Sequence, residues 1–232
     1  MDKNTFVSYF KELKNQECCT IKRFKLECDD LYPCLEDDTG QTLFDGHYIY
    51  HTAWAARVLA KTKPIVHVDI SSSLYFSAIV SGFVPVKFFD YRPADLRLSN
   101  LTSQHADLLS LPFEDNSISS LSCMHVIEHI GLGRYGDPVC YNGDLKALSE
   151  IKRVVARGGS ILLVVPVGSP RICYNAHRIY AFQQVLELFT DCTLKEYAIV
   201  PDNQSLGLLI DLPISIVNEQ KYACGCFWFQ KN

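Results

Sequence analysis

Three aspartates follow short apolar segments, at positions where a sheet protein binds ligands. Asp69 lies at the end of IVHVDI, Asp90 ends VPVKFFD, and Asp107 ends a weaker third segment. If these segments are parallel strands, their carboxyl ends meet at one edge of the sheet, and ligands bind beyond that edge. A carboxylate placed there accepts hydrogen bonds from ribose hydroxyls. The alternative is that the aspartates only cap loops or end strands.

A second set of polar residues could bind and deprotonate a substrate. His129 and His177 are candidate general bases, because an imidazole titrates near neutral pH. Guanidinium groups match phosphate and carboxylate geometry, so arginines are candidate anion ligands. The predicted substrate-binding residues are Arg134, Tyr135, Arg171, Asn175 and Arg178. A structural alternative stays open, in which Arg134 pairs with Asp137 while His177 and Arg178 begin a helix.

One stretch also matches a zinc pattern. The residues from His125 to His129 read H-x-x-E-H, which occurs in a class of zinc metallopeptidases. That chemistry needs both histidines on one face of a helix together with a third ligand. Here the stretch follows an apolar segment, and Gly131 and Gly133 leave little room for a helix. We therefore predict no metal site, and we expect the ten cysteines, none of them in C-x-x-C spacing, to be mostly reduced and structural.

The elements that must position these residues alternate between strands and helices. Strands are expected at residues 65–70, 84–90, 102–107, 118–126, 160–167, 194–200 and 222–229. Helices are expected at residues 1–15, 47–62, 74–82, 144–159 and 177–189, with Gly158-Gly159 ending the fourth. The pattern predicts an α/β fold with a doubly wound, mostly parallel seven-stranded sheet. We expect residues 1–63 to be an N-terminal helical extension and residues 64–232 to be the sheet domain.

Several motifs, in this order, resemble class I S-adenosylmethionine (SAM) methyltransferases. SQHADLLSLPFEDNSISSLSCMHVIEHI (103–130) is similar to the family's run through strands three and four. ALSEIKRVVARGGSILLVVPV (147–167) is similar to the helix and strand that follow. The resemblance covers roughly residues 65–167 and implies a Rossmann-like fold that binds SAM. The residues it places at the cofactor are Asp69, Ser71, Ser73, Asp90, Tyr91, Asp107 and His125.

The turn after the first strand departs from that family. The usual motif reads D-x-G-x-G, whereas this chain has Asp69-Ile70-Ser71-Ser72-Ser73. Glycine matters at such a turn because it permits a positive φ and a close approach of the backbone to the ligand. Two interpretations follow: either the serine hydroxyls hydrogen-bond the cofactor, or the site no longer binds it.

Three further segments resemble a branch of methyltransferase-like proteins of unknown function. They are GHYIYHTAWAARVLA (46–60), HVIEHIGLGRYGDP (125–138) and PVGSPRICYNAHRIY (166–180), within a match over about residues 46–200. That branch is associated with bacterial surface-polysaccharide biosynthesis, and it keeps a glycine at the position of Ser71. The resemblance implies a sugar, sugar nucleotide or glycan precursor as the acceptor.

Composition argues against some classes of partner. The formal net charge of −4 gives no basic footprint for nucleic acid. No apolar run approaches the roughly 20 residues that cross a bilayer, and the polar N-terminal segment lacks the apolar core of a secretory signal. We therefore expect a cytoplasmic protein with a small-molecule substrate. The apolar C-terminal strand could form a homodimer, or it could lie inside the sheet.

Taken together, the sequence predicts a SAM-dependent methyltransferase that acts on a small polar acceptor. Two alternatives stay open. One is a non-catalytic binding or scaffold protein on the same fold. The other is an enzyme of this fold with a different nucleotide ligand, since a fold by itself does not determine a function.

Overall fold

An eight-stranded sheet is the centre of the computed structural model, which describes residues 1–232. The strands are β1 (His67–Ile70), β2 (Val86–Asp90), β3 (Leu101–His105), β4 (Ile118–Met124), β5 (Val155–Val167), β8 (Cys192–Val200), β9 (Leu209–Ile210) and β10 (Ala223–Lys231). Their order is β3-β2-β1-β4-β5-β10-β8-β9. Strands β1 to β5 pair in parallel, and β8, β9 and β10 pair antiparallel. The predicted α/β sheet is confirmed, with β9 as a short addition at its edge.

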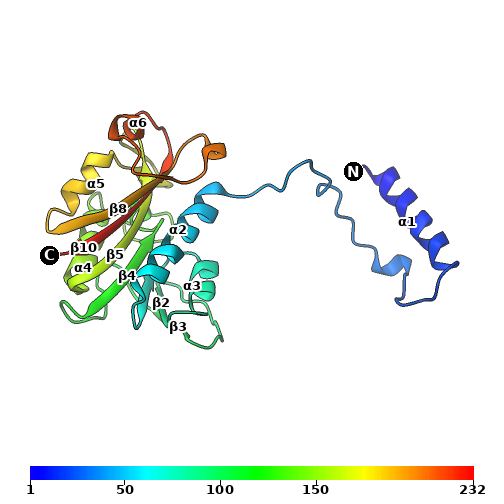
Figure 1. Cartoon of the computed structure of the whole chain (residues 1–232), viewed down its shortest axis with the longest axis horizontal. Helices are drawn as coiled ribbons and strands as arrows, with labels where there is room; N and C mark the ends of the chain where they lie inside the picture. The colour runs from blue at the N-terminus through cyan, green and yellow to red at the C-terminus, as the bar shows by residue number, and fades with distance from the viewer. The chain divides into compact units, whose positions relative to one another are not determined.

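Helices cover both faces of the sheet (Figure 1). Helices α2 (Gly46–Thr62) and α3 (Leu74–Val80) bury apolar residues against one face, in a cluster that includes Trp54, Phe76 and Trp228. Helices α4 (Gly143–Val154), α5 (Phe182–Leu188) and α6 (Ile214–Asn218) contribute to the cluster on the other face. Because both faces of the central strands are buried, β5 carries an almost unbroken apolar run, as expected for a doubly wound sheet.

Helix α2 belongs to the sheet unit. The Asp45 side chain caps its first turn by accepting a hydrogen bond from the Tyr48 amide at 3.2 Å. Its buried residues fall on one stripe, and the Trp54 indole N–H donates to Glu196 of β8 at 2.9 Å. The chain contains two compact units, Met1–Phe44 and Asp45–Asn232, and α2 lies in the second.

The unit Met1–Phe44 contains helix α1 (Lys3–Glu17) and the short 3-10 helix η1 (Cys28–Asp30). Asp2 caps α1 by accepting hydrogen bonds from the amides of Asn4 and Thr5 at 2.8 and 3.0 Å. Glu17 forms ion pairs with Lys14 and Lys22. The predicted first helix is therefore present, although none of its residues is buried.

Two predicted helices have different limits. Helix α4 ends at Val154, and Gly158 lies inside β5 with a φ of +75°, where the pairing with β4 shifts register. The glycine pair therefore forms a strand irregularity and does not end the helix. The predicted helix at residues 177–189 is replaced in part by β7 (His177–Ile179), which pairs with β6 (Arg171–Cys173), and α5 begins only at Phe182.

The C-terminal strand lies inside the sheet. Strand β10 is hydrogen-bonded to β5 on one side and β8 on the other, so its backbone is not free to pair with a second copy. Of the two possibilities stated for this strand, the structure therefore supports a place inside the sheet and gives no support to a homodimer through β10. No helix has the length and apolar character needed to cross a membrane.

Candidate active site

A cavity of about 780 Å³ opens beyond the carboxyl ends of β1 to β4. Its volume lies within the range of small-molecule binding sites. The half beside β1, β2 and β3 is lined by Ser71, Asp90, Tyr91, Arg92, Ala106, Asp107, Leu108 and Leu109. The half beside α2 and the loop after β4 is lined by polar and aromatic residues that include His47, Tyr48, His125, Glu128, His129, Arg134, Tyr135, His177 and Tyr222. Of the predicted cofactor set, Ser71, Asp90, Tyr91 and Asp107 line the first half, whereas His125 lies in the second half with the predicted residues His129, Arg134, Tyr135 and His177.

The serine-rich turn keeps the backbone conformation that glycine would adopt. Ser71 has a φ of +54°, in the left-handed region that favours glycine. Its amide donates to the carbonyl of Phe89 at 2.7 Å, and the hydroxyl of Ser72 accepts from the Met124 amide at 3.1 Å. These bonds tie the turn to β2 and β4. Ser71 lines the cavity, whereas Ser73 precedes helix α3 and does not.

Asp69 lies beneath the turn and does not reach the cavity. It is fully buried, and its carboxylate accepts hydrogen bonds from the hydroxyls of Ser77 and Ser122. Ser122 in turn accepts from Nε2 of the buried His67 at 2.9 Å, while Nδ1 of this imidazole accepts from Ser120 at 2.8 Å. Burial raises the pKa of Asp69 to about 6 and lowers that of His67 to about 3. This network supports the first strand and its turn.

The other two aspartates point into the cavity and share one local geometry. Oδ1 of Asp90 accepts from the Arg92 amide at 2.7 Å, and Oδ1 of Asp107 accepts from the Leu109 amide at 2.8 Å. Such a bond to the amide two residues on fixes the carboxylate direction. In both residues Oδ2 makes no hydrogen bond within the chain, so it can accept from a ligand. The exposed Tyr91 lies at the rim between them.

His129 is held in one orientation in the half of the cavity beside α2 and the loop after β4. Its Nδ1–H donates to the carbonyl of Ala176 at 2.5 Å, which leaves Nε2 of the neutral ring as the basic nitrogen. Arg134 donates to the same carbonyl at 3.2 Å. The guanidinium groups of Arg92 and Arg134 each lie 5.1 Å from the centre of the Tyr135 ring. These contacts bring two cations to the boundary between the halves.

A row of stacked rings forms another wall of the same half of the cavity. His177 stacks on Tyr222 and Tyr222 on His47, with centroids 4.8 and 5.2 Å apart. His47 stacks on His125, with centroids 5.7 Å apart and planes inclined by 6°. Burial is the main cause that lowers the pKa of His177. The imidazole is therefore neutral near pH 7, as a general base must be.

Burial and His125 set the protonation of the α2 histidines. Burial, reinforced by the charge of His125, lowers the pKa of His47 to about 4 and that of His51 to about 3. Burial disfavours a charge on His125 as well, but the Cys224 sulfur and the Glu128 carboxylate beside it raise its pKa. Burial also raises the pKa of the Cys224 thiol well above its ordinary value.

Three predicted substrate ligands lie outside the cavity. The buried guanidinium of Arg178 donates to the carbonyls of Ile130 and Tyr141 at 2.7 and 2.9 Å, and its Nε lies 3.5 Å from Asp144. It therefore holds the loop between β4 and α4 in place. Arg171 donates to backbone carbonyls of Ser169 and Lys221, and Asn175 has a φ of +60° in the β6–β7 turn. None of the three faces the cavity.

The alternative interpretations of the loop after β4 are not realised. Asp137 accepts from the amides of Gly131 and Tyr135, at 2.7 and 3.2 Å, and forms no pair with Arg134. The H-x-x-E-H stretch forms only the short 3-10 helix η2 (Ile127–His129). His125 donates through Nδ1 to Glu128 at 2.9 Å, whereas His129 bonds to Ala176, so the two histidines do not share a helix face as the metallopeptidase pattern requires.

Sequence reasoning did not single out several of the lining residues. His47 and Tyr48 lie in a segment predicted as a helix, and Tyr222 lies in a segment predicted as a strand. Glu128 belongs to the H-x-x-E-H stretch, whose spacing by itself indicates only the zinc pattern excluded above. The signal for His47 is the pair of histidines four residues apart on α2, but nothing local indicates that β4 and β10 lie beside it.

Two comparisons by sequence each match only part of the chain. A family described as "Caenorhabditis protein of unknown function, DUF268" matches residues 97–194. An uncharacterized protein of Methanocaldococcus jannaschii is 35% identical over 60 residues, which is 26% of this chain and only 21% of that relative. Both matches cover less than half of this chain, so neither shows its family.

Solved structures match over a greater length. The 1,6-didemethyltoxoflavin-N1-methyltransferase of Burkholderia thailandensis, with bound S-adenosylhomocysteine, superposes with a TM-score of 0.57 at 11% identity, over 84% of this chain and 93% of that one. The N-methyltransferase NodS of Bradyrhizobium japonicum, also with S-adenosylhomocysteine, gives 0.51 at 12% identity, over 81% and 89%. With this strand order and these neighbours, the chain has the Rossmann-like fold of class I SAM-dependent methyltransferases.

Proposed function

We propose that the protein is a SAM-dependent methyltransferase that acts on a small polar acceptor. One observation carries the proposal: a single cavity joins carboxylates at the ends of β2 and β3 to a half rich in histidine, arginine and tyrosine. A cofactor and an acceptor can therefore meet in one cavity. Structural neighbours with S-adenosylhomocysteine bound support the choice of cofactor.

The first half fits the cofactor. The positive φ of Ser71 preserves the turn that lets the backbone approach a ligand, and the free oxygens of Asp90 and Asp107 suit hydroxyl or amino donors of a nucleoside. When bound, SAM supplies a methyl group on a positively charged sulfur. The preserved turn also weakens the interpretation of the serines as a decayed site.

The second half fits a hydroxyl-rich acceptor. His129, held through Nδ1, presents Nε2 to take the proton that an acceptor oxygen or nitrogen releases as it receives the methyl group. Arg92, Arg134 and Tyr135 bind polar or anionic groups of the acceptor. We propose a sugar, sugar nucleotide or glycan precursor, and the sequence resemblance described above supports that choice.

Calorimetric titration of the purified full chain with SAM and with S-adenosylhomocysteine tests the proposal. We expect saturable binding of both, weakened at least tenfold by Asp90→Asn, which keeps the shape and the bond to the Arg92 amide but removes the charge. Asp95→Asn is the matched control, because Asp95 is exposed in the loop after β2 and does not line the cavity. Folded protein that binds neither ligand at millimolar concentration would contradict the proposal. A scaffold binds no nucleoside, whereas binding of a nucleotide sugar without SAM would favour an enzyme of different specificity.

A further inference from the structure

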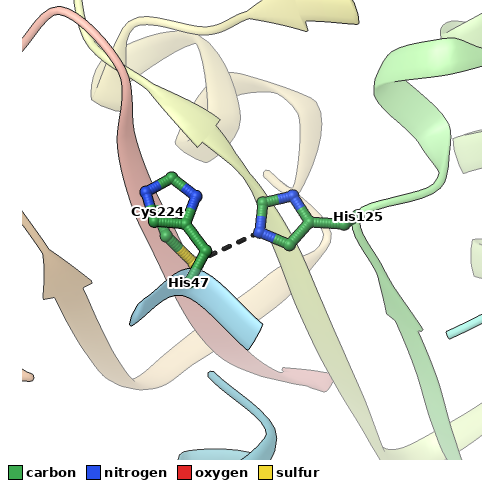
Figure 2. Close-up of side chains that lie close together, drawn as sticks. All are labelled: His47, His125 and Cys224. Carbon is green, nitrogen blue, oxygen red and sulfur yellow. Dashed lines mark hydrogen bonds between the residues drawn. The ribbon is translucent and has the colours of Figure 1, made fainter. Parts of the chain in front are cut away.

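Three potential metal ligands converge from distant parts of the chain. His47 comes from the first turn of α2, His125 from the end of β4, and Cys224 from β10 (Figure 2). One donor atom of each lies within 4.8 Å of the donor atoms of the other two. Nε2 of His125 and Sγ of Cys224 are 3.4 Å apart. No two of these residues are near one another in sequence, so the fold alone creates the cluster.

The spacing suits a tetrahedral ion. With Zn–S and Zn–N bonds of about 2.3 and 2.0–2.1 Å, two ligand atoms of a tetrahedral site are separated by roughly 3.4–3.6 Å. The contact between His125 and Cys224 already has this length. The wider separations, at most 4.8 Å, close with movements of about 1 Å or less per side chain. Imidazole nitrogen and thiolate sulfur are the ligand types that zinc prefers.

The surroundings of His125 match those of a metal-bound histidine. Its other ring nitrogen, Nδ1, donates to Oε1 of Glu128 at 2.9 Å, and a histidine that binds a metal almost always donates this way to a carboxylate or carbonyl. The Glu128 side chain is 1% exposed, and its Oε2 has no hydrogen-bond partner. In this structure the imidazolium of His125 offsets the buried carboxylate, and a Zn²⁺ ion bound to Nε2 of the neutral His125 ring would supply that positive charge instead.

His51, one turn along α2, is a second buried group beside His125 with an unpaired polar atom. Its Nδ1–H donates to the His47 carbonyl at 2.6 Å, which ties it to the backbone of the first proposed ligand. Its Nε2 is buried without a partner, and its ring packs edge-on against His125 with centroids 5.1 Å apart. Two unsatisfied buried polar atoms therefore lie around the same imidazole, where buried polar atoms are rarely left unpaired.

We propose that His47, His125 and Cys224 bind one Zn²⁺ ion, with its fourth coordination position open to the cavity. His47 and His125 line the cavity, whereas Cys224 is fully buried behind them. The open position therefore faces the acceptor half, which is the half of the cavity beside α2 and the loop after β4. Three protein ligands with one exchangeable position are typical of catalytic zinc. Cys224 binds as the thiolate and His125 as the neutral imidazole with Nδ1–H still on Glu128, so binding releases the thiol proton and the Nε2 proton of His125 to solvent. The open position takes water or, if the proposed methyl transfer is correct, an oxygen or sulfur nucleophile of the acceptor.

Metal loading of the full chain tests the site without any acceptor. The protein is stripped with a chelator under reducing conditions, reloaded with Zn²⁺ or Co²⁺, and assayed for bound metal by mass spectrometry and for cobalt by absorption. We expect one equivalent of metal and a thiolate-to-cobalt charge-transfer band. Cys224→Ser should abolish the band and weaken binding by more than 100-fold, and Glu128→Gln should weaken it by about 10–100-fold through His125.

Matched variants separate ligand loss from misfolding. Cys192→Ser changes a partly buried cysteine of β8 that lies outside the cluster and should keep both the stoichiometry and the band. Circular dichroism of each variant checks the fold. If the folded wild-type chain binds no stoichiometric metal, or if Cys224→Ser binds cobalt with an unchanged spectrum, the site does not exist. A SAM titration of the stripped protein is independent of this result, so failure of the metal site and failure of the proposed function are distinguished.

A small anion tests the open position. Azide added to the cobalt protein should shift the visible bands, because it can replace water at a fourth position that faces the cavity. Unchanged bands at saturating azide would mean that the ion is closed off, and the claim of an open position would be wrong.

Discussion

Tyr222 stacks on His177 with ring centroids 4.8 Å apart and planes inclined by 29°. The opposite neighbour of Tyr222 in the row is His47, so one aromatic side chain from the start of β10 connects the β6–β7 hairpin to helix α2. This contact fixes the wall of the acceptor half. We expect Tyr222→Leu to raise the KM for the acceptor while the SAM dissociation constant stays unchanged, and Tyr222→Phe to behave as wild type, since it keeps the stack. Equal effects of both variants would mean that the hydroxyl, not the ring, matters.

The two cavity histidines should affect turnover and spare cofactor binding. We expect His129→Gln to lower turnover by about 10²–10⁴-fold, because a general base contributes a factor of this size. We expect His177→Ala to lower turnover as well, with the SAM dissociation constant unchanged in both variants. The measurement is S-adenosylhomocysteine formation with an acceptor from a panel of sugars and nucleotide sugars. His105→Gln, outside the cavity, is the control. Full activity of either variant would remove that histidine from the mechanism.

The serine turn should accept glycine but not a β-branched residue. Ser71 has a φ of +54°, so Ser71→Gly should leave the free energy of unfolding within about 1 kcal/mol of wild type and keep SAM affinity. Ser71→Val should cost about 1–3 kcal/mol and weaken SAM binding, because a β-branched side chain is strained there. Ser73→Val, at a φ of −66°, is the matched control. Urea unfolding and calorimetry measure the two effects, and a tolerated valine at position 71 would show that the turn can rearrange.

Arg178 should matter for stability rather than for anion binding. Its buried guanidinium donates to carbonyls of the loop between β4 and α4, so Arg178→Met leaves these acceptors unpaired and should cost about 3–5 kcal/mol. Limited proteolysis should then cut the loop faster. Arg171→Met, at the exposed end of β6, should stay within about 0.5 kcal/mol of wild type. A stable Arg178→Met protein that has lost only acceptor binding would return Arg178 to the substrate set.

The buried His67 should make stability fall in acid. Its pKa is about 3 in the folded chain and about 6.5 when unfolded, so below roughly pH 6.5 only the unfolded chain takes up the proton. Its contribution to the free energy of unfolding therefore falls by about 1.4 kcal/mol per pH unit, down to about pH 3. Asp69, with a pKa raised to about 6, acts in the opposite direction, because the folded chain binds that proton first.

A variant isolates the histidine from other groups. His67→Gln keeps a donor for Ser122 but does not titrate, so its stability deficit relative to wild type should shrink as the pH is lowered. Urea unfolding of both proteins at about pH 7.5, 6 and 5 gives the difference. A deficit that is constant across this range would show that His67 is protonated in the folded chain.

The sequence by itself determined the fold and half of the cavity. The apolar runs predict strands, and in a parallel sheet consecutive strand ends lie at one edge, so the sequence predicts a common site for Asp90 and Asp107. Local pattern also predicts α2, because its buried residues repeat with a helical period. What it could not predict was which side chains at the strand ends point into the cavity and which point into the core. Asp69 precedes a turn as a ligand-binding acid would, yet it points inward to Ser77 and Ser122.

The tertiary structure decided the rest, because contacts between distant segments have no sequence signature. Arg178 has the chemistry of an anion ligand, but the loop packed against it supplies the carbonyls that occupy its guanidinium. His47, His125 and Cys224 are separated by 78 and 99 residues, and only the placement of α2 over the ends of β4 and β10 brings their donor atoms together. Spacing rules find metal ligands that share one helix or one turn. They do not find ligands that meet only when a sheet is assembled.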